Sequence, residues 1–556
     1  MKEQIIKQLS KHLDLNKQQI QTLLEVPPSQ ELGDYSFPCF ALSKKLKESP
    51  NKIASNLTKK ILLGKEFEKV EFKGPYVNFF LNKKHLAEKT LSKILKEKDK
   101  YGSSKIGKNK TVVIDMSSPN IAKPFGVGHL RSTIIGNSIS KIAKFSGYKV
   151  VKINYLGDWG TPFGKIIAGY KEFGNSKKLE KDSIKHLYEI YTKVSKDEKY
   201  EEIGRQWFKK LEQGDKEALT LWKKFRQESI KDFDEIYRLL NVKFDVTSGE
   251  SFYNNKMEPV VKELERKKLL KGSQNAKIVD LEEYNLGIAL IQKQDKTTLY
   301  VTRDLTAAIY RKKKYNANYL IYEVGAEQKL YFKQFFKILE LLGYKWYKNC
   351  FHVDHGLYLG KDNKKLASRK GQTIFMKDVL NETVELASEE IKKRDKLPFK
   401  ESNRRALAIA RAAIIYGDLK NYRANDTVFD IEKFLKFEGN TGPYLMYTYA
   451  RAKSILRKAK YKFKKPRIKE INDSEKALIS KLSLFPGVVS KSYEQFAPSL
   501  IANYTYELAQ KFNEFYHSNK VISSDNEAFR LVLVGASSQV LKNALDLLAI
   551  QPLERM

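Results

Sequence analysis

The stretch Ser117–Ser132 combines glycines, a lysine and a histidine in a spacing suited to chemistry on phosphates. It follows an apolar, β-branched run, Thr111–Met116, which predicts a strand buried on both faces of a parallel sheet. Apolar residues then recur at helical spacing from Leu130, and Gly147 predicts the end of that helix. A second strand, Lys149–Tyr155, completes a predicted βαβ unit.

The loop before this helix is a predicted phosphate site. In an open α/β sheet, ligands bind beyond the carboxyl ends of the strands, and a helix N-terminus there offers unpaired amides and a positive dipole end. Gly126 and Gly128 let the backbone approach a ligand closely, His129 can donate a hydrogen bond to an anion, and Lys123 adds a positive charge. The alternative is a glycine-containing turn that only reverses the chain.

The segment Lys364–Gly371 is a second candidate for phosphate chemistry. Four basic residues, two small ones and a glycine occupy its eight positions. Such a composition suits a mobile loop that closes over a polyphosphate and stabilises charge in a transition state. Because lysine is abundant throughout the chain, a solvated turn is the alternative.

The segment Leu299–Arg311 offers an acidic group beside an aromatic one. If a helix begins near Arg303, Asp304 lies in its first turn and Tyr300 just before it. This pair could bind a cationic group, and a planar guanidinium would gain a bidentate pairing with the carboxylate. The alternative is that Asp304 only complements the helix dipole.

A fourth segment, Tyr322–Gln328, follows a predicted strand at Asn318–Ile321 and contains a glycine turn with polar side chains. Parallel sheets present their ligands at such strand ends. Further on, His352 and His355 lie three positions apart with only Asp354 as an acidic neighbour. We therefore expect these histidines to line or support a pocket and not to bind a metal.

The composition restricts the class of protein. The chain has 556 residues, enough for several domains, and its 103 Lys and Arg against 66 Asp and Glu give a formal charge of +37. This charge favours a polyanionic partner, although many basic residues must lie on solvated helix faces. Two cysteines, Cys39 and Cys350, exclude a disulfide framework and favour a cytoplasmic setting. Without a signal-peptide core or an apolar run near 20 residues, we expect no membrane association.

Three regions follow one another along the chain. The first 100 residues predict a small α+β domain, with two strands around a Gly-Pro turn in Val70–Leu81. A nucleotide-binding α/β fold follows, interrupted by a lysine-rich helical insertion at about Lys178–Leu240. After Asn403 the pattern predicts a helical bundle. The predicted helices of that bundle are Ala406–Tyr416, Gly442–Lys458, Asp473–Leu484, Leu500–Tyr516 and Ala528–Ala549.

Taken together, these segments resemble one family, the class I arginyl-tRNA synthetases, over essentially the whole chain. The matching segments are Ser117–Thr133, Asn154–Thr161, Lys365–Arg369, Gly33–Tyr35, Gly74–Asn78, Gly442–Tyr447 and Leu553–Met556. The resemblance implies a Rossmann-type α/β catalytic domain at 104–435, an N-terminal α+β additional domain at 1–103 that contacts the outer corner of tRNA, and an all-α anticodon-binding domain at 436–556.

The resemblance also implies site residues, which we state as predictions. Arginine would be held by Ser118, Pro119, Asn120, His129, Tyr300, Asp304 and Gln328, with Glu250 as a possible second acidic partner. ATP would be bound by Lys123, Gly126, Gly128, His129, Lys365, Ser368 and Arg369. The residues expected to act in catalysis are Lys123, His129, Lys365, Arg369 and Lys370. Contacts with tRNA are implied for Asn78, Phe79, Tyr444, Tyr447, Arg451, Tyr516 and Met556, although the tyrosines could equally pack in a helical core.

Two positions depart from the family pattern. Gly126 stands where the family has the first histidine of its His-x-Gly-His signature, so a side chain expected to act on the ATP phosphates is absent. Ser368 stands where the Lys-Met-Ser-Lys-Ser loop has its second lysine, and the resemblance implies that Lys123 supplies the compensating charge. A charge that reaches the same phosphate from another loop serves the same electrostatic purpose.

The implied reaction joins L-arginine to tRNA-Arg in two steps. ATP, with Mg²⁺, would give arginyl-adenylate and pyrophosphate, and the 3′-terminal ribose of the tRNA would then take the arginyl group. Positioning and charge stabilisation suffice for such chemistry, so we expect no covalent enzyme intermediate and no structural metal. A cytoplasmic monomer is the expected state.

Three other interpretations remain open at this point. A synthetase-like tRNA-binding protein with weak or no activation could result from the glycine at position 126. A class I synthetase for another amino acid is disfavoured by Asp304 and Tyr300, which suit a cationic substrate. A basic nucleic-acid-binding protein would not need the strand-loop-helix phosphate site.

Overall fold

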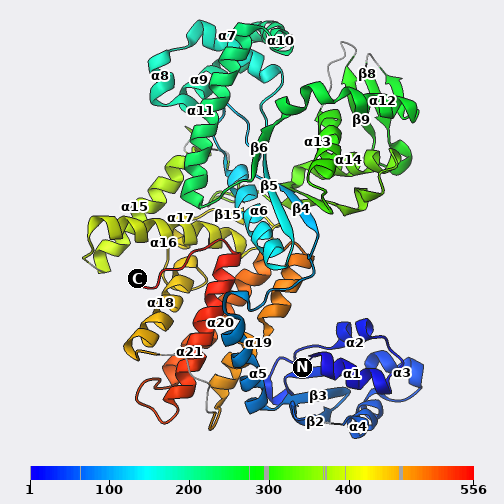
Figure 1. Cartoon of the computed structure of the whole chain (residues 1–556), viewed down its shortest axis with the longest axis vertical. Helices are drawn as coiled ribbons and strands as arrows, with labels where there is room; N and C mark the ends of the chain where they lie inside the picture. The colour runs from blue at the N-terminus through cyan, green and yellow to red at the C-terminus, as the bar shows by residue number, and fades with distance from the viewer. Residues whose placement is uncertain are drawn as a thin grey trace. The chain divides into compact units, whose positions relative to one another are not determined.

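The computed structural model describes residues 2–62, 64–273, 276–293, 300–366, 368–369, 372–394, 396–461 and 468–556. The chain divides into two compact units. The first comprises residues 1–101, 452–484 and 508–540, and the second comprises 102–451, 485–507 and 541–556. Figure 1 labels most helices and several strands of the two units.

A five-stranded parallel sheet forms the centre of the second unit, in the order β11-β10-β4-β5-β6. Its strands are β4 (Thr111–Asp115), β5 (Lys149–Leu156), β6 (Val246–Gly249), β10 (Tyr319–Gly325) and β11 (Cys350–His355). Every residue of β4 is buried, as its β-branched composition predicts for a central strand. The predicted α/β class is thereby confirmed.

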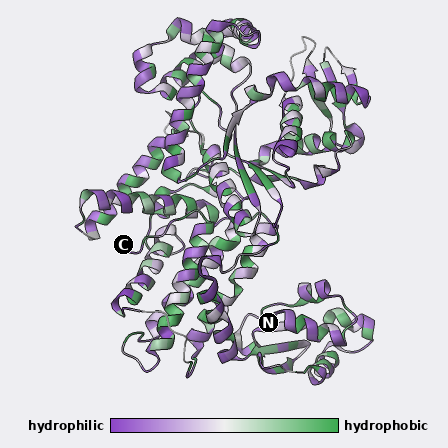
Figure 2. Ribbon diagram, viewed as in Figure 1, coloured by the Kyte–Doolittle hydropathy of each residue, from purple (hydrophilic) through white to green (hydrophobic). Residues whose placement is uncertain are grey.

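Helices cover both faces of this sheet, as in a Rossmann-type fold. On one face lies α6 (Val127–Phe145), which is buried over most of its length. On the other face, α12 (Glu258–Arg266), α13 (Tyr300–Lys314) and α14 (Lys329–Leu341) pack on β4, β5 and β10 through a cluster of buried apolar residues. Figure 2 shows hydrophobic residues concentrated along the central strands, whereas the surrounding helices mix both kinds. Burial of these apolar faces is what holds the layers together.

Two insertions interrupt the sheet. Between β5 and β6 the chain forms five helices, where the sequence predicts one helical region: α7 (Thr161–Phe173), α8 (Ser176–Lys181), α9 (Ser183–Ser195), α10 (Lys199–Glu212) and α11 (Lys216–Leu240). After β6 come the short helix η3 (Glu250–Lys256), α12 and an antiparallel sheet of β7 (Leu270–Ser273), β8 (Ala276–Asp280) and β9 (Ile288–Lys293). The antiparallel sheet escapes the sequence analysis because its strands are short and half exposed.

Beyond β11 the second unit is mainly helical. It contains α15 (Met376–Arg394), α16 (Phe399–Leu419), α17 (Ile431–Phe434) and two strand pairs, β12 (Tyr358–Leu359) with β15 (Thr427–Val428) and β13 (Ser368–Arg369) with β14 (Gln372–Thr373). The predicted C-terminal helices are confirmed as α18 (Gly442–Lys458), α19 (Asp473–Glu494), α20 (Pro498–Ser518) and α21 (Glu527–Leu547). The α19 helix continues through Pro486, where the sequence predicts its end.

The first unit contains the predicted N-terminal α+β fold. Its antiparallel sheet has the order β1-β3-β2, and β2 and β3 are the two strands predicted around the Gly-Pro turn. The elements are α1 (Lys2–His12), α2 (Lys17–Leu23), β1 (Tyr35–Pro38), α3 (Phe40–Leu46), α4 (Pro50–Lys60), β2 (Phe67–Lys73), β3 (Tyr76–Leu81) and α5 (Lys83–Glu97).

Two predicted boundaries are wrong. Tyr300 is the first described residue of α13, so Asp304 lies in the second turn of that helix and not in the first. Strand β10 runs to Gly325, four residues beyond the predicted end, because its pairing with β11 continues to that residue. Among the described helices, none combines the length and the apolar composition that crossing a membrane would need.

Candidate active site

The loop between β4 and α6 has an unusual backbone conformation, and side chains of helix α11 stabilise it. Ser117, Ser118 and Ala122 adopt positive φ angles of 74°, 49° and 58°, which side chains other than glycine rarely do. Helix α11 fixes this conformation, because the Ser117 and Tyr237 hydroxyls lie 2.8 Å apart and the Ala122 amide donates to Ser229 Oγ at 2.9 Å. The loop is therefore set before any ligand arrives.

A pocket of about 550 Å³ opens where this loop meets the N-terminus of α6. Gly126 is the N-cap of α6, and a Cβ built on it would meet only His129 Nδ1, at 3.8 Å. A Cβ on Gly128 would meet nothing within 4 Å. The helix end thus faces open space, with the positive end of its dipole available to an anion. Predicted residues that line the pocket are Ser118, Asn120, Lys123, Gly126, Gly128, His129, Gln328 and Lys365.

His129 is a neutral hydrogen-bond donor in this pocket. Burial, together with the nearby charges of His355 and Lys123, lowers the pKa of His129 to about 4. Its Nδ1 accepts a hydrogen bond from the Gly126 amide at 3.2 Å, so the proton of the neutral ring resides on Nε2. The ring can therefore donate to a phosphate oxygen without a charge of its own.

Two lysines bring positive charge to the same pocket. Lys123 Nζ donates to the Tyr191 hydroxyl at 3.1 Å and lies 4.2 Å from the centre of that ring. Lys365 Nζ lies 3.1 Å from Glu327 Oε1 at the rim. Of the other predicted basic-loop residues, Ser368 and Arg369 are described only as backbone in β13, and Lys370 lies outside the described residues.

The second part of the site is a cluster of buried charged side chains, called the carboxylate chamber below, where α13 packs on the sheet. Three carboxylates, Asp115, Glu250 and Asp304, are present with two guanidinium groups, Arg303 and Arg311. Arg311 lies 2.6 Å from Asp115, and Arg303 lies 3.7 Å from Glu250. Asp304 has no guanidinium partner at ion-pair distance among these five side chains, and its carboxylate accepts a hydrogen bond from the Tyr331 hydroxyl.

The pKa values of Asp304 and Glu250 reflect this environment. Burial raises the pKa of Asp304 to about 6, although a hydrogen bond from the Tyr331 hydroxyl acts in the opposite direction. Burial raises the pKa of Glu250 to about 8 despite the nearby Arg303. The Tyr155 hydroxyl is buried close to both charges and has no hydrogen-bond partner among the described residues. A bound cation with several N–H donors would satisfy all these groups at once.

Ser118 joins the two parts. Its hydroxyl lines the phosphate pocket and donates to Asp115 Oδ1 at 2.9 Å. Pro119 is buried, and its carbonyl accepts from the Gly157 amide at 3.1 Å, while Asn120 is exposed over Gly157. A Cβ at residue 157 would lie 1.9 Å from the Asn120 side-chain oxygen, so any other residue there requires the exposed Asn120 side chain to move.

The remaining predicted arginine contacts lie at the edges. Tyr300 is 60% exposed. Partial burial of its hydroxyl, and secondly the charge of Glu250, raise the pKa of Tyr300. Gln328 is exposed at the rim of the phosphate pocket and not inside the carboxylate chamber. Asp304 is thus the predicted residue that the structure brings into the charged chamber, together with Glu250.

Sequence analysis misses a network of buried polar groups beneath the phosphate pocket. Arg131 is fully buried on α6, lies 3.3 Å from Asp418 and donates to the Leu357 carbonyl at 3.1 Å. Tyr358 donates to the same aspartate. His355 Nδ1 lies 2.9 Å from Glu323 Oε1, as expected for a histidine that supports a pocket. Only the basic residue inside an apolar helix could have indicated this network.

The predicted tRNA contacts fall into two groups. Asn78 and Phe79 are 4% and 1% exposed, and Asn78 accepts from Ser36 at 2.6 Å, so β3 uses both side chains for its own packing. The prediction that Phe79 reaches tRNA is wrong for this conformation. In the second unit, Tyr447 is 41% exposed with the Arg451 guanidinium 5.0 Å from its ring centre.

Three more predicted tRNA contacts have the following surroundings. Tyr444 packs on Tyr506, with 5.8 Å between the ring centres. Tyr516, in the first unit, is 37% exposed, and Met556 is half-buried at the chain end.

A phosphate pocket at the carboxyl edge of a parallel sheet, joined to a chamber with one excess carboxylate, defines a nucleotide-using α/β enzyme with a cationic second substrate. Comparison with known proteins narrows this class. The family described as tRNA synthetases class I (R), catalytic domain, matches residues 90–431. The arginyl tRNA synthetase N-terminal domain matches residues 1–81, and the DALR anticodon binding domain matches residues 445–556.

Full-length relatives agree. The chain is 45% identical to "Arginine--tRNA ligase" of Clostridium perfringens over 100% of both chains. It is 46% identical to "Arginine--tRNA ligase 2" of Bacillus anthracis, over 98% of this chain and 97% of the relative. Among solved structures, the arginyl-tRNA synthetase of Plasmodium falciparum superimposes with a TM-score of 0.82 at 26% identity, covering 96% of this chain and 94% of the other.

The chain therefore belongs to the class I arginyl-tRNA synthetases, as the sequence resemblance predicts. It is an ATP-dependent ligase that joins arginine to tRNA. The alternative of a synthetase-like protein without activation finds no support among these relatives, which carry the name of the enzyme. At lower sequence identity, 23%, the arginyl-tRNA synthetase of Thermus thermophilus has a similar fold, with a TM-score of 0.81.

Proposed function

We propose that the carboxylate chamber recognises the guanidinium group of arginine. The observation that carries this proposal is that Asp304 has no guanidinium partner among the described side chains of the chamber, while Glu250 has only a longer contact of 3.7 Å with Arg303. A planar guanidinium can pair with a carboxylate through two parallel hydrogen bonds, which a lysine ammonium cannot reproduce. A neutral amino acid would leave the buried charge unpaired and would be rejected strongly. Tyr300 covers the entrance in this proposal.

The α-amino and α-carboxylate groups of arginine would then lie at the loop between β4 and α6. Ser118, Asn120 and His129 are assigned to them, with Gln328 at the rim and the Pro119 carbonyl supporting the loop. This assignment rests on the link from the phosphate pocket through the Ser118 hydroxyl to Asp115, at 2.9 Å. Arginine in the chamber would thereby present its carboxylate toward ATP.

The phosphates of ATP are assigned to the N-terminus of α6. The Gly128 amide in the first turn, the His129 Nε2–H, and the ammonium groups of Lys123 and Lys365 converge on one pocket of about 550 Å³, and the Gly126 amide orients the His129 ring through Nδ1. ATP is bound as its Mg²⁺ complex in this proposal. Ser368, Arg369 and Lys370 belong to the loop that would bring further positive charge to the departing pyrophosphate.

The chemistry balances without a covalent enzyme intermediate. An arginine carboxylate oxygen attacks the α-phosphorus of ATP, the bond to the bridging oxygen of the β-phosphate breaks, and pyrophosphate leaves. A terminal ribose hydroxyl of the tRNA then attacks the arginyl carbonyl carbon, and AMP leaves with the bonding electron pair. The enzyme contributes positioning and charge stabilisation.

The tRNA contacts are proposed by region. Residues 1–103 would contact the outer corner of tRNA, 104–435 would hold its acceptor end, and 436–556 would bind the anticodon. In the second unit the exposed Tyr447 with Arg451 suits stacking on unpaired bases, and Tyr444 and Met556 would support the surface of that unit. In the first unit the exposed Tyr516 suits the same kind of contact. Asn78 would position β3 instead of touching RNA. The enzyme is proposed to act as a cytoplasmic monomer.

The decisive experiment replaces the unpaired carboxylate. Asp304→Asn keeps the shape of the side chain and can still accept from Tyr331, but it removes the charge. We expect kcat/KM for arginine in tRNA charging to fall by about 10²- to 10³-fold, in line with losses of roughly 3–4 kcal/mol when one partner of a buried pair is removed.

The matched control is Asp280→Asn, an exposed carboxylate on β8 that pairs with Lys271 at 2.8 Å. It should charge tRNA as the wild type does. ATP binding should be equal in both variants. Robust charging by Asp304→Asn would remove the guanidinium assignment.

A further inference from the structure

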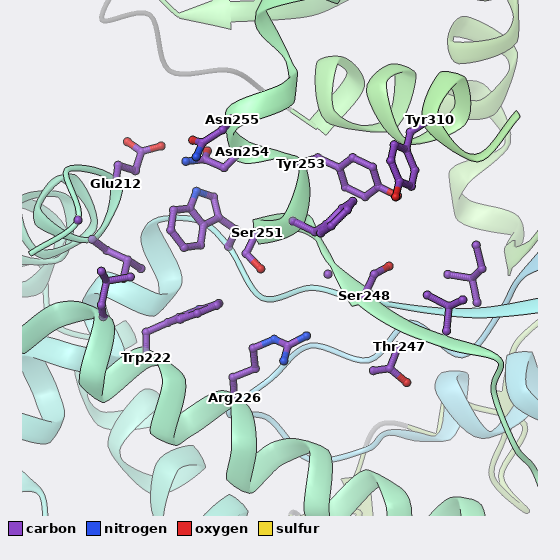
Figure 3. A pocket seen from close by; sticks show the side chains of 18 of the residues that line it. Glu212, Trp222, Arg226, Thr247, Ser248, Ser251, Tyr253, Asn254, Asn255 and Tyr310 are labelled. Carbon is purple, nitrogen blue, oxygen red and sulfur yellow. The ribbon is translucent and has the colours of Figure 1, made fainter. Parts of the chain in front are cut away.

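A second cavity of about 580 Å³ lies beyond β6, the last strand of the central sheet. Figure 3 shows Trp222 and Arg226 extending into it from α11, opposite Asn254 and Asn255 of η3, with Tyr253 and Tyr310 forming an aromatic wall. None of the roles assigned above uses this space. Its size falls in the range of about 300–1,000 Å³ that is usual for small-ligand sites.

The lining combines aromatic rings with polar groups that lack partners. Among the described residues, the Arg226 guanidinium makes one hydrogen bond, from Nε to Asp158 at 2.9 Å, which leaves its two terminal nitrogens available. Trp159, also in the lining, is 6% exposed, and its indole N–H has no partner in the described part of the chain. A purely apolar occupant would leave these donors unsatisfied.

This set of groups matches one ligand chemistry best. Flat aromatic rings stack on nucleobases, and amide side chains offer both a donor and an acceptor to a base edge. A guanidinium with two free nitrogens is suited to a phosphate. Rings such as Trp222, amides such as Asn254 and the Arg226 guanidinium occur here in one cavity. A peptide or a lipid would use only part of this lining.

The cavity is also linked to the carboxylate chamber by a chain of hydrogen bonds through Asp158. Asp158 accepts from Arg226 on one side and, through both oxygens, from the amide and hydroxyl of Ser251 at 2.8 and 2.9 Å on the other. Glu250, the residue before this serine, is a proposed partner of the substrate guanidinium. Gly249 has no room for a side chain, because a Cβ there would lie 2.1 Å from an Asp158 oxygen. An occupant that engages Arg226 therefore acts on the segment that positions Glu250.

We propose that this cavity binds an unstacked nucleotide, with its base against the Trp222 side and its phosphate on Arg226. The source is either the unpaired 3′ strand of tRNA, whose last ribose must reach the carboxylate chamber, or a free nucleotide. The proposal rests on the arginyl-tRNA ligase activity only for the first source. Binding of a free nucleotide can be measured without any turnover.

The first test is a titration of the full-length enzyme with cytidine 5′-monophosphate. The chain has four tryptophans, so a Trp207→Phe, Trp346→Phe background leaves emission from the two in the cavity. We expect CMP to quench this emission and ribose 5-phosphate, which lacks a base, not to do so. Arg226→Gln and Asn254→Ala should each weaken CMP binding by at least about fivefold, since stacking and charge contacts contribute roughly 1–3 kcal/mol each.

Two features keep this test interpretable. Lys224→Gln is the matched control, because it removes a positive charge from the exposed face of the same helix outside the cavity lining. Asn254→Ala leaves the pair of Arg226 and Asp158 intact, so a folding defect of Arg226→Gln does not decide the outcome. The unfolding midpoint of each variant is measured alongside.

The second test distinguishes the two sources. With complete tRNA-Arg, Arg226→Gln and Asn254→Ala should raise the KM for tRNA by about 5- to 50-fold. A tRNA lacking its last three nucleotides should bind equally to wild type and variants. Loss of CMP binding with an unchanged KM for tRNA would assign the cavity to a free nucleotide. An absence of CMP quenching together with variants that match Lys224→Gln in both assays would overturn the proposal.

Discussion

The phosphate pocket and the carboxylate chamber adjoin the same sheet but are built in different ways. The phosphate pocket uses mainly backbone groups at the start of α6 and a histidine that burial keeps neutral. The chamber uses buried side-chain charges, with two carboxyl groups whose pKa values are raised to about 6 and about 8. Backbone dipoles keep their strength at any pH, whereas the raised carboxyl groups must ionise before they can pair with a cation.

This difference means that the two substrates respond to different changes. Loss of one hydrogen-bond donor at the start of α6 is expected to slow the activation step, because the phosphates of ATP are then less well positioned. Loss of one carboxylate charge in the chamber is expected to weaken arginine binding, because an ion pair is lost. Four predictions follow, from the largest expected effect to the smallest. Each one separates the two parts of the site.

The largest effect is expected at His129. We expect His129→Ala to lower kcat for arginine-dependent ATP–pyrophosphate exchange by about 10²- to 10³-fold, because it removes a preorganised donor at the developing charge. His129→Asn, which keeps a neutral N–H donor, should recover at least about tenfold of this loss. Because His129 is also assigned to the α-groups of arginine, the KM for arginine should rise in the Ala variant and be partly restored in the Asn variant. Equal activity of the Ala and Asn variants would show that the neutral donor is not what matters.

An intermediate effect is expected from pH. Because protonated Asp304 and Glu250 cannot pair with a guanidinium, the KM for arginine should fall by about tenfold or more as pH rises from 6 to 8.5. The KM for ATP should change by less than about threefold over the same range, since His129, with its pKa lowered to about 4, stays neutral throughout. Steady-state kinetics in overlapping buffers measures both constants.

The same titration has a stability consequence with a definite sign. The folded-state pKa values of the two carboxyl groups lie above their unfolded values, so the stability they contribute is present at low pH and is lost as pH rises through about 6 and then about 8. Bound arginine offsets this loss. Arginine should therefore raise the melting temperature more at pH 8.5 than at pH 6, and an equal shift at both would contradict the charge assignment.

The smallest effect is expected at Gly126. Its φ of −87° is accessible to any residue, and the space beyond a Cβ is open apart from His129 Nδ1 at 3.8 Å. We expect Gly126→His to fold normally and to change kcat for activation by no more than about threefold, or to raise it by adding a donor to the phosphate pocket. A large loss of activity would show that the backbone must stay uncovered at this position. Gly157→Ala, where a Cβ would collide with Asn120 at 1.9 Å, is the contrasting variant.

Most residues of the phosphate pocket could be predicted from the sequence, because the strand, loop and helix that form it are contiguous in the chain. A strand, a glycine-bearing loop and the first turn of a helix follow one another in Thr111–Leu130, so local rules on strands, helix ends and glycine locate the site. The same rules predicted the central strands and the C-terminal helices. They failed at the end of β10, where pairing with β11 sets the boundary, and at the start of α13, whose first described residue is Tyr300.

What the sequence by itself determined is therefore the order of the elements, the phosphate-binding turn and the family. Tertiary structure alone decided how the buried charges are paired. It sets Arg311 beside Asp115, leaves Asp304 without a guanidinium partner, and brings Arg131 to Asp418 from 287 residues away. It also decided the cavity at Arg226, whose walls come from α11, β6, η3 and α13. The physical reason is that burial and pairing set the energy of a charge, and both depend on neighbours that the fold, and not the local sequence, brings together.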